Sequence, residues 1–228
     1  MTTEKTIYVV LGGTSGIGAE LSQQLASDNA VVHVASRKTG LDISDEQSVY
    51  HYFETIGAFD HLIVTAGSYA PAGSYAPAGK VVDVEVSQAK YAFDTKFWGA
   101  INAAKHGARY IKKGGSITLT SGMLSRKVVA NTYVKTAINA AIEATTKVLA
   151  KELAPIRVNA VSPGLTKTEA YQGMNEDDRN AMYKRTQNSL PVGKVGEASD
   201  VAKAYLLLIE NTYMTGAVID VDGGALLG

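Results

Sequence analysis

The sequence predicts an α/β protein in which a doubly wound parallel sheet carries helices on both faces. Segments typical of buried strands alternate with segments typical of amphipathic helices along the whole chain, which is the pattern of a parallel sheet. The chain has 228 residues, of which 46% are hydrophobic, enough for one well-buried domain and short for two. We therefore expect a single domain over residues 1–228.

The first unit of this pattern is a strand, a glycine-rich turn and a helix near the N-terminus. Residues 7–11 are apolar and rich in β-branched side chains, and leucines four residues apart mark one face of the following helix. Between them, Gly12, Gly16 and Gly18 form a Gly-x-x-x-Gly-x-Gly turn. A helix start has free N–H groups and partial positive charge, and glycines let a pyrophosphate approach closely. The turn therefore predicts a phosphate site; a tight turn without a ligand is the alternative.

Composition argues against nucleic-acid, membrane and metal-dependent functions. Acidic and basic residues balance at 22 each, so no net field favours nucleic acid or an anionic membrane. No segment resembles a secretion signal, and no apolar run approaches the ~18 residues of a membrane helix. The chain has no cysteine, and His33, His51, His61 and His106 lack metal-ligand spacing. We expect a cytoplasmic protein without a metal.

The second strand, residues 30–35, ends in Ser36, Arg37 and Lys38. In a Rossmann-like βαβ unit, this strand end faces the adenosine ribose of a dinucleotide. A carboxylate there binds a free 2′-hydroxyl, whereas a basic residue binds a 2′-phosphate. Here the carboxylate is missing and two basic residues are present, so the sequence favours NADP over NAD. The alternative is a pair of solvated charges at a strand end.

The remaining elements follow the same alternation of strands and helices. We expect strands at residues 40–43, 60–67, 116–122, 157–162 and 217–221. We expect helices at residues 44–56, 87–112, 132–153 and 198–209, with the glycine pair at 114–115 stopping the second of these. The connection into 40–43 is too short for a crossover helix, so we expect that helix to have been trimmed.

Two stretches do not fit the alternation. The hexapeptide Ser-Tyr-Ala-Pro-Ala-Gly occurs twice, at residues 68–73 and 74–79, and its proline and glycine predict a loop, either beside a substrate pocket or simply mobile on the surface. A polar segment at about residues 166–190 is typical of a lid. Its residues Tyr171, Met174, Met182 and Tyr183 would form walls of the pocket, although an amphipathic helix packed on its own protein would have the same pattern.

Five motifs in order then identify a resemblance to the short-chain dehydrogenase/reductase family. They lie at residues 11–18, 66–67, 149–164, 190–193 and 215–224, and together they span nearly the whole chain. The resemblance implies a Rossmann-like, doubly wound sheet of about seven strands, a homodimer or homotetramer, and NADP(H) as the cofactor. It also places Asp42 and Ile43 against the adenine, Ala66 and Gly67 by the riboses, and residues 163–168 along the nicotinamide.

The complete expected cofactor-binding set combines the resemblance with the strand-end argument. It comprises Gly12, Thr14, Ser15, Gly16, Ile17, Gly18, Ser36, Arg37, Lys38, Asp42, Ile43, Ala66, Gly67, Pro163, Gly164, Leu165, Thr166 and Thr168.

The departures from the family lie at the catalytic residues. Members use an Asn, a Ser and a Tyr four residues before a Lys, and none of the 12 tyrosines here has Lys at that spacing. Aligned without gaps, the Tyr position falls on Lys135, the Lys position on Asn139 and the Asn position on Lys96, while Ser121 is retained. Tyr133 would enter the site only if it precedes the regular helix.

Two hypotheses on function follow, with a third beside them. In the first, the protein is an NADPH-dependent oxidoreductase for a small carbonyl or alcohol; Lys96 or Lys135 acts as proton donor or electrostatic clamp, and Ser121 hydrogen-bonds the substrate oxygen. In the second, it is a catalytically silent NADPH-binding or sensor protein, favoured by Leu11 in place of Thr and by Val64 and Thr65 in place of Asn-Asn. The third is dehydration, epimerisation or another lysine-assisted reaction on the same fold.

Overall fold

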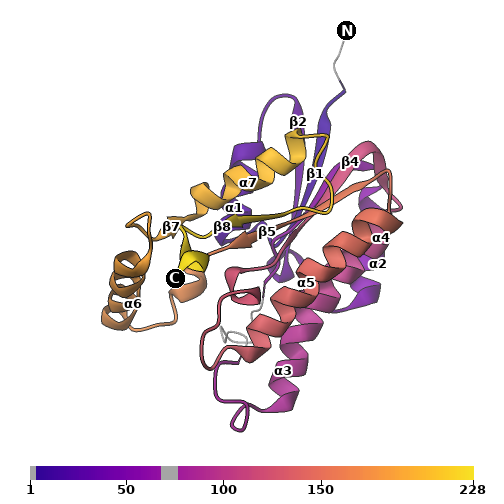
Figure 1. Ribbon diagram of the computed structural model, residues 1–228. Coiled ribbons are helices and arrows are strands. Elements are labelled where there is room, and N and C mark those ends of the chain that lie inside the picture. Colours follow the sequence, from indigo (N-terminus) through magenta and orange to yellow (C-terminus); the bar gives the residue numbers. More distant parts are fainter. Residues whose placement is uncertain (1–3, 68–76) are drawn as a thin grey trace.

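The computed structural model describes residues 4–67 and 77–228, which form the α/β fold that the sequence predicts (Figure 1). Six parallel strands lie in the order β2-β1-β3-β4-β5-β8. From β1 the chain moves to β2 on one side and then to β3 on the other, so the strand order reverses beside β1. Such a reversal leaves a crevice at the carboxyl ends of the strands, where ligands of open α/β sheets bind. The strands are β1 (Thr6–Leu11), β2 (Ala30–Ala35), β3 (Phe59–Val64), β4 (Ile111–Thr120), β5 (Arg157–Pro163) and β8 (Val218–Val221).

Helices cover both faces of the sheet, as the doubly wound prediction requires (Figure 1). One face is packed by α2 (Glu46–Ile56), α4 (Gly99–Gly107) and α5 (Tyr133–Glu152), and the other by α1 (Gly16–Leu25) and α7 (Ala198–Glu210). Strand side chains alternate between the two layers: Val9 and Leu11 of β1 join the first core and Val10 joins the second. The near-continuous apolar strands of the sequence therefore reflect burial on both sides.

The prediction of a strand at residues 40–43, the third of the seven expected in chain order, is wrong. These residues follow a short 3₁₀ helix (Arg37–Thr39) and turn at Gly40, whose φ is +91°. The Leu41 N–H donates to the Ser36 carbonyl oxygen, so a local turn satisfies the backbone instead of a sheet ladder. Leu41 and Ile43 are both buried. Their burial, which alternates as in a strand, comes from the hydrophobic core on that face of the sheet, where Ile43 lies against Gly99 at the start of α4.

The expected helix at 87–112 is interrupted and ends earlier than predicted. It consists of α3 (Val86–Phe93), a π-helical segment (Asp94–Trp98) and α4, which ends at Gly107. The glycine pair at 114–115 does not stop it but lies inside β4. Residues 111 and 116 of β4 pair with 59 and 61 of β3, so the extra residues between them form a bulge. The sequence after α4 offers no clear stop signal before this bulged strand, so the pattern alone does not show where the helix ends.

The polar segment after β5 leaves the main sheet and forms a small two-stranded sheet of its own. It contains β6 (Thr166–Lys167), a 3₁₀ turn (Glu169–Tyr171), α6 (Glu176–Ser189) and β7 (Gly196–Glu197), and β6 pairs with β7 in parallel. No α6 residue is buried, which separates this helix from the core helices. The first hexapeptide and half of the second lie outside the described residues. Among the helices of the described residues, none is both long and apolar enough to cross a lipid bilayer.

Candidate active site

A cavity of about 720 Å³ opens at the carboxyl ends of the strands, on the side of the strand-order reversal. Its size falls in the range of small-molecule and cofactor sites. It is lined by every sequence-predicted site residue except Thr166, whose hydroxyl donates to the Gly164 carbonyl oxygen at 3.1 Å. Of the four residues expected as pocket walls, Tyr171 lines the cavity, whereas Met174, Met182 and Tyr183 do not. The lining residues that the sequence did not indicate are Leu11, Ala35, Leu41, Thr65, Thr95, Gly122, Met123, Leu124, Glu169 and Ala170.

One end of the cavity is the glycine-loop end, made of residues 12–18. Gly12 has φ +93°, and a Cβ on it would lie 2.8 Å from the Ala66 Cα. A Cβ on Gly18 would lie 2.5 Å from the Gly12 carbonyl oxygen. Both distances are shorter than real Cβ contacts. Only glycine at positions 12 and 18 therefore allows the loop to pack this closely against the start of α1 and the chain after β3. The backbone itself therefore forms this end.

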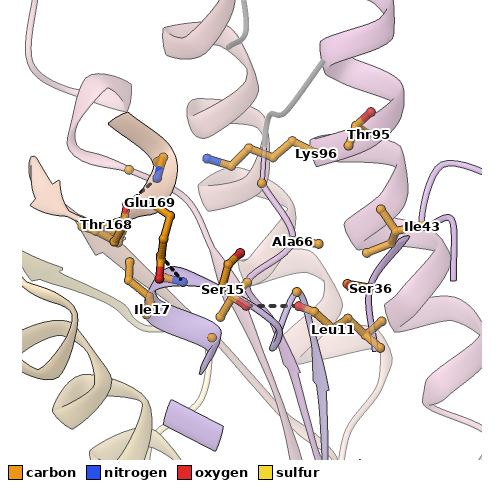
Figure 2. A pocket seen from close by; sticks show the side chains of 18 of the residues that line it. Leu11, Ser15, Ile17, Ser36, Ile43, Ala66, Thr95, Lys96, Thr168 and Glu169 are labelled. Atoms are coloured by element: carbon orange, nitrogen blue, oxygen red, sulfur yellow. Dashed lines mark hydrogen bonds between the residues drawn. The ribbon is translucent and has the colours of Figure 1, made fainter. Parts of the chain in front are cut away.

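Glu169 reaches the glycine-loop end from the segment after β6 (Figure 2). Its Oε2 accepts a hydrogen bond of 2.7 Å from the N–H of Gly16, the first residue of α1. Helix N-termini favour negative charge, so this carboxylate lies where an anion is expected. The two residues are 153 positions apart, and no motif in the sequence indicates the contact.

The end of β2 borders the same cavity. Thr14 donates to the Ser36 hydroxyl at 2.9 Å, and the Ser36 hydroxyl accepts from the Lys38 N–H at 3.1 Å. These contacts join the glycine loop to the turn after β2. The side chains of Arg37 and Lys38 are exposed at the cavity edge, and Arg37 donates to the Tyr91 hydroxyl at 3.4 Å.

The opposite end of the cavity is the lysine cluster, defined as Lys96, Ser121, Lys135 and Asn139. Lys96 Nζ donates to the Ser121 carbonyl oxygen at 2.9 Å and to Asn139 Oδ1 at 2.7 Å. Lys135 and Asn139 are four residues apart on α5 and share one helix face, and both line the cavity. The structure thus brings together the four residues that the alignment selects.

Electrostatics in the lysine cluster weaken proton binding. Burial, with the nearby charge of Lys135, lowers the pKa of Lys96 to about 8. Burial also lowers the pKa of Lys135. Both amines are therefore closer to giving up a proton near neutral pH than an exposed lysine is.

Lys96 owes its place to the π-helical segment between α3 and α4. A π turn contains one more residue than an α turn and is frequent at functional sites. Figure 2 shows the Lys96 side chain extending into the cavity from this helix. Thr95, next to it, also lines the cavity, and its buried Oγ1 has no hydrogen-bond partner among the described residues. No sequence pattern indicates Thr95 as a site residue.

Tyr133 lies outside the site. It is the first residue of α5 rather than a residue preceding the regular helix, and 39% of it is exposed. It lines a second, smaller cavity with residues 79–81, 124–129, 131–132 and 136, not the one that holds the lysine cluster. Tyr133 thus does not precede the regular helix, as its entry into the site would require.

The sheet, its reversal point and the glycine-loop cavity define a Rossmann-like α/β protein. The chain belongs to the short-chain dehydrogenase/reductase family: residues 14–225 match the family model described as enoyl-(acyl carrier protein) reductase. It is 32% identical to the short-chain dehydrogenase/reductase ucsE of Acremonium sp, over 98% of this chain and 96% of that protein. It is 30% identical to the 3alpha-hydroxysteroid dehydrogenase of Mediterraneibacter gnavus, over 99% and 98%.

Among solved structures, one that is 84% identical has a TM-score of 0.94 and covers 99% of this chain and 100% of its own. It is described as a small-chain dehydrogenase in complex with NADPH. Another, 80% identical with a TM-score of 0.90, covers 99% and 100% and is described as a small-chain dehydrogenase.

Proposed function

We propose that the protein is an NADPH-dependent oxidoreductase that transfers a hydride between nicotinamide and a small carbonyl or alcohol. The observation that carries the proposal is a single cavity in which the glycine-loop end and the lysine cluster face each other. The 84% identical structure, described as an NADPH complex, supports the choice of cofactor. When bound, NADPH supplies the hydride.

The residues present fit a dinucleotide. The Gly16 N–H already holds an anionic oxygen, that of Glu169, which a phosphate oxygen would replace. Thr95 Oγ1 is a buried hydroxyl without a partner within residues 4–67 and 77–228, at a wall of the same cavity. Arg37 and Lys38 offer positive charge at the end of β2, where a 2′-phosphate would lie. Asp42, Ala66 and Gly164 line the space between the ends.

The lysine cluster supplies the polar chemistry in this proposal. Lys96 is held by two hydrogen bonds, so its role is to fix Ser121 and Asn139. Lys135 stands at the position of the family's tyrosine and has a lowered pKa. Its ammonium would stabilise the negative charge that develops on the carbonyl oxygen and would donate the proton. The cluster is thus an altered catalytic site without the usual Tyr and Lys.

A catalytically silent NADPH-binding or sensor protein is the second candidate. It is favoured by the Lys96 contacts, because a lysine tied to Asn139 and to the Ser121 backbone is a stable element that binds without reacting. Turnover distinguishes the two candidates. NADPH binding without oxidation in the presence of carbonyls would favour the silent protein.

The same proposal includes the organisation of the chain. Residues 1–228 form one domain, and residues 166–190 act as a lid, which is supported by the cavity contacts of Glu169 and Tyr171 and by the exposure of α6. A homodimer or homotetramer is supported by exposed apolar side chains on helices, such as Trp98 and Val148. The proposed location is the cytoplasm.

The test is a fluorescence titration of the purified protein with NADPH and with NADH. We expect NADPH to bind more tightly, and Arg37→Ala to weaken NADPH by about 1–3 kcal/mol, the range for a charge-assisted hydrogen bond, with little change for NADH. Arg109→Ala, an exposed arginine on the chain between α4 and β4, is the matched control. A panel of aldehydes and ketones then measures NADPH oxidation. Failure to bind either nucleotide would overturn the proposal.

A further inference from the structure

Glu143 lies behind Ser121, on the same face of α5 as Lys135 and Asn139. The three residues are spaced four apart, which places them in one row along the helix. Only Glu143 does not line the cavity. Its Oε1 accepts hydrogen bonds from the hydroxyls of Ser121 at 2.9 Å and Ser125 at 2.6 Å. The side chain is 13% exposed, so these bonds lie largely out of water.

Ser121 is fixed at each of its polar groups. Its N–H donates to the Val161 carbonyl oxygen at 2.9 Å, and its carbonyl oxygen accepts from Lys96. Its hydroxyl has one proton, and a carboxylate can only accept, so that proton lies on the line to Glu143. The Ser121 oxygen can then offer only lone pairs to the cavity.

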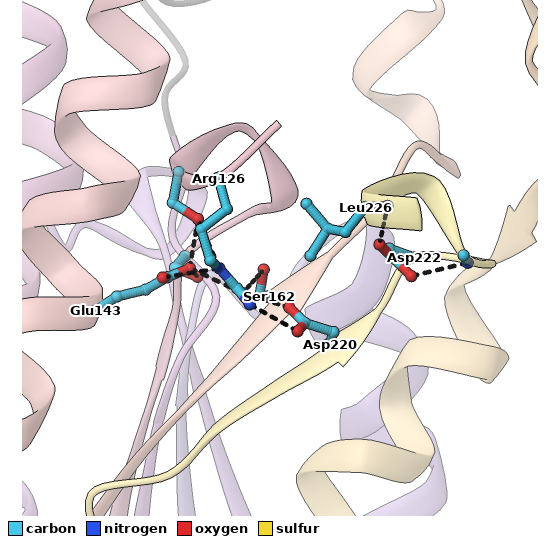
Figure 3. Close-up of polar contacts among 9 residues, drawn as sticks. Arg126, Glu143, Ser162, Asp220, Asp222 and Leu226 are labelled. Atoms are coloured by element: carbon cyan, nitrogen blue, oxygen red, sulfur yellow. Dashed lines mark hydrogen bonds and ion pairs between the residues drawn. The ribbon is translucent and has the colours of Figure 1, made fainter. Parts of the chain in front are cut away.

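Glu143 is itself held by a further set of contacts, shown in Figure 3. Arg126 Nε lies 3.2 Å from Glu143 Oε2, and the same guanidinium forms a two-pronged contact with Asp220 of β8. Arg126 also donates to the Ser162 hydroxyl of β5 at 3.3 Å. The guanidinium bridges the two carboxylates and ties Glu143 to the end of the sheet. The carboxylate therefore cannot turn away from Ser121 without breaking several contacts.

We propose that Glu143 is a positioning residue that makes Ser121 a hydrogen-bond acceptor within the cavity, so that the site binds the alcohol form of its substrate in preference to the carbonyl form. The inference rests on the proposed oxidoreductase function and deepens it. An alcohol has an O–H that can donate to the Ser121 oxygen, whereas a carbonyl oxygen has no proton to give. The hydrogen-bond donor that meets the carbonyl oxygen is then the Lys135 ammonium, not the Ser121 hydroxyl.

The test compares the KM of a carbonyl with the inhibition constant of its own alcohol, both during NADPH-dependent reduction. The probes are 4-nitrobenzaldehyde with 4-nitrobenzyl alcohol and cyclohexanone with cyclohexanol, using the pair that is reduced faster. Ser121→Ala should raise the inhibition constant of the alcohol about tenfold, as expected for one hydrogen bond, and leave the carbonyl KM within about twofold. Glu143→Met removes both acceptor oxygens at similar volume. It should raise the ratio of the alcohol inhibition constant to the carbonyl KM by a similar factor.

Three controls separate positioning from a general structural effect. Ser125→Ala removes the same kind of bond to Glu143 from a serine that does not line the main cavity, and it should leave the ratio unchanged. Glu143→Met should add nothing to the ratio when Ser121 is already alanine. NADPH affinity should be unchanged in every variant, because the glycine-loop end is untouched.

Two results would overturn the assignment. In the first, Ser121→Ala raises the carbonyl KM and leaves the alcohol constant unchanged, which means that Ser121 donates to the carbonyl. In the second, Glu143→Met shifts the ratio equally with and without the Ser121 hydroxyl. A wild-type protein that binds NADPH but reduces neither probe would overturn the oxidoreductase function, and the role of Glu143 with it.

Discussion

The two ends of the cavity differ in composition: the backbone forms the glycine-loop end, and side chains form most of the lysine cluster. At the glycine-loop end, Gly12 and Gly18 bring backbone against backbone, and side chains would collide with it. In the lysine cluster, the Lys96 side chain from the π-helical segment donates to the Asn139 side chain of α5 and to the carbonyl oxygen of Ser121, directly after β4. Backbone geometry tolerates few substitutions, whereas a side-chain cluster can exchange residues if its contacts are re-formed. The prediction that Lys and Asn replace the family's catalytic residues, while its glycine loop is kept, accords with this difference.

The largest effect is expected in the lysine cluster. Lys135→Met should lower kcat/KM for carbonyl reduction about 10²–10³-fold, about 3–4 kcal/mol, because the substrate oxygen loses its stabilising charge. NADPH affinity should stay the same, which would show that the two ends act separately. Lys147→Met, an exposed lysine on the same helix outside the cavity, serves as the control and should retain full activity. Unchanged turnover in Lys135→Met would remove Lys135 from the mechanism.

A similar effect on stability is expected at the glycine-loop end. Gly12→Ala places a side chain at φ +93° against the Ala66 and Thr65 backbone, and should cost about 3 kcal/mol of unfolding free energy. Gly40→Ala is the matched control: its φ is +91°, but nothing lies within 4 Å. It should cost only the ~1 kcal/mol of a left-handed conformation. Equal losses in thermal unfolding would mean that strain, not close approach, defines the loop.

The pH dependence of stability tests the burial of Lys96. Its pKa of about 8 in the folded state is below the 10.5 of an ordinary lysine, so the unfolded state binds more protons between these values. Stability from this group should therefore be lowest below pH 8 and should rise towards pH 10.5. We would measure the unfolding free energy of the wild type and of Lys96→Met in urea. Across that pH window, the difference should move by about 1 kcal/mol in favour of the wild type. This is less than the full ~1.4 kcal/mol per pKa unit because Lys96 is partly exposed. A flat difference would show that Lys96 is solvated.

The smallest effect is expected from Glu169. Its carboxylate and a nucleotide phosphate would compete for the Gly16 N–H, so Glu169→Ala should tighten NADPH binding about two- to fivefold, about 0.5–1 kcal/mol. Glu176→Ala, in the exposed first turn of α6, is the control for general loss of negative charge. Equal or weaker NADPH binding in Glu169→Ala, measured by titration, would show that the two do not compete.

Sequence patterns predicted the parts of the molecule that depend on local rules. The alternation of strands and helices led to the sheet, and the glycine spacing led to one end of the cavity. Residues 40–43 misled because alternating burial does not distinguish a strand from a chain packed beside α4. Thr166 lies outside the cavity wall because its hydroxyl turns back to the Gly164 carbonyl, a choice of side-chain direction that composition does not reveal.

The candidate site was predicted where the family alignment could be followed and missed where contacts span the chain. Lys96, Ser121, Lys135 and Asn139 came from position alone. Glu169 accepts a hydrogen bond from Gly16, 153 residues away, and Glu143 accepts one from Ser121, 22 residues away. No spacing rule links such pairs, because only the folded sheet brings them together.

The π-helical segment between α3 and α4 makes the lysine cluster sensitive to chain length. A π turn is equivalent to an α-helix carrying one inserted residue. Deleting a single codon within residues 94–98 would restore regular helix and rotate α3 by about 100° relative to α4, since each residue turns an α-helix by that angle. The residue at position 96 could remain lysine while its side chain no longer points into the cavity. Insertion and deletion, as well as substitution, can therefore add a cavity-lining side chain at this position or remove one.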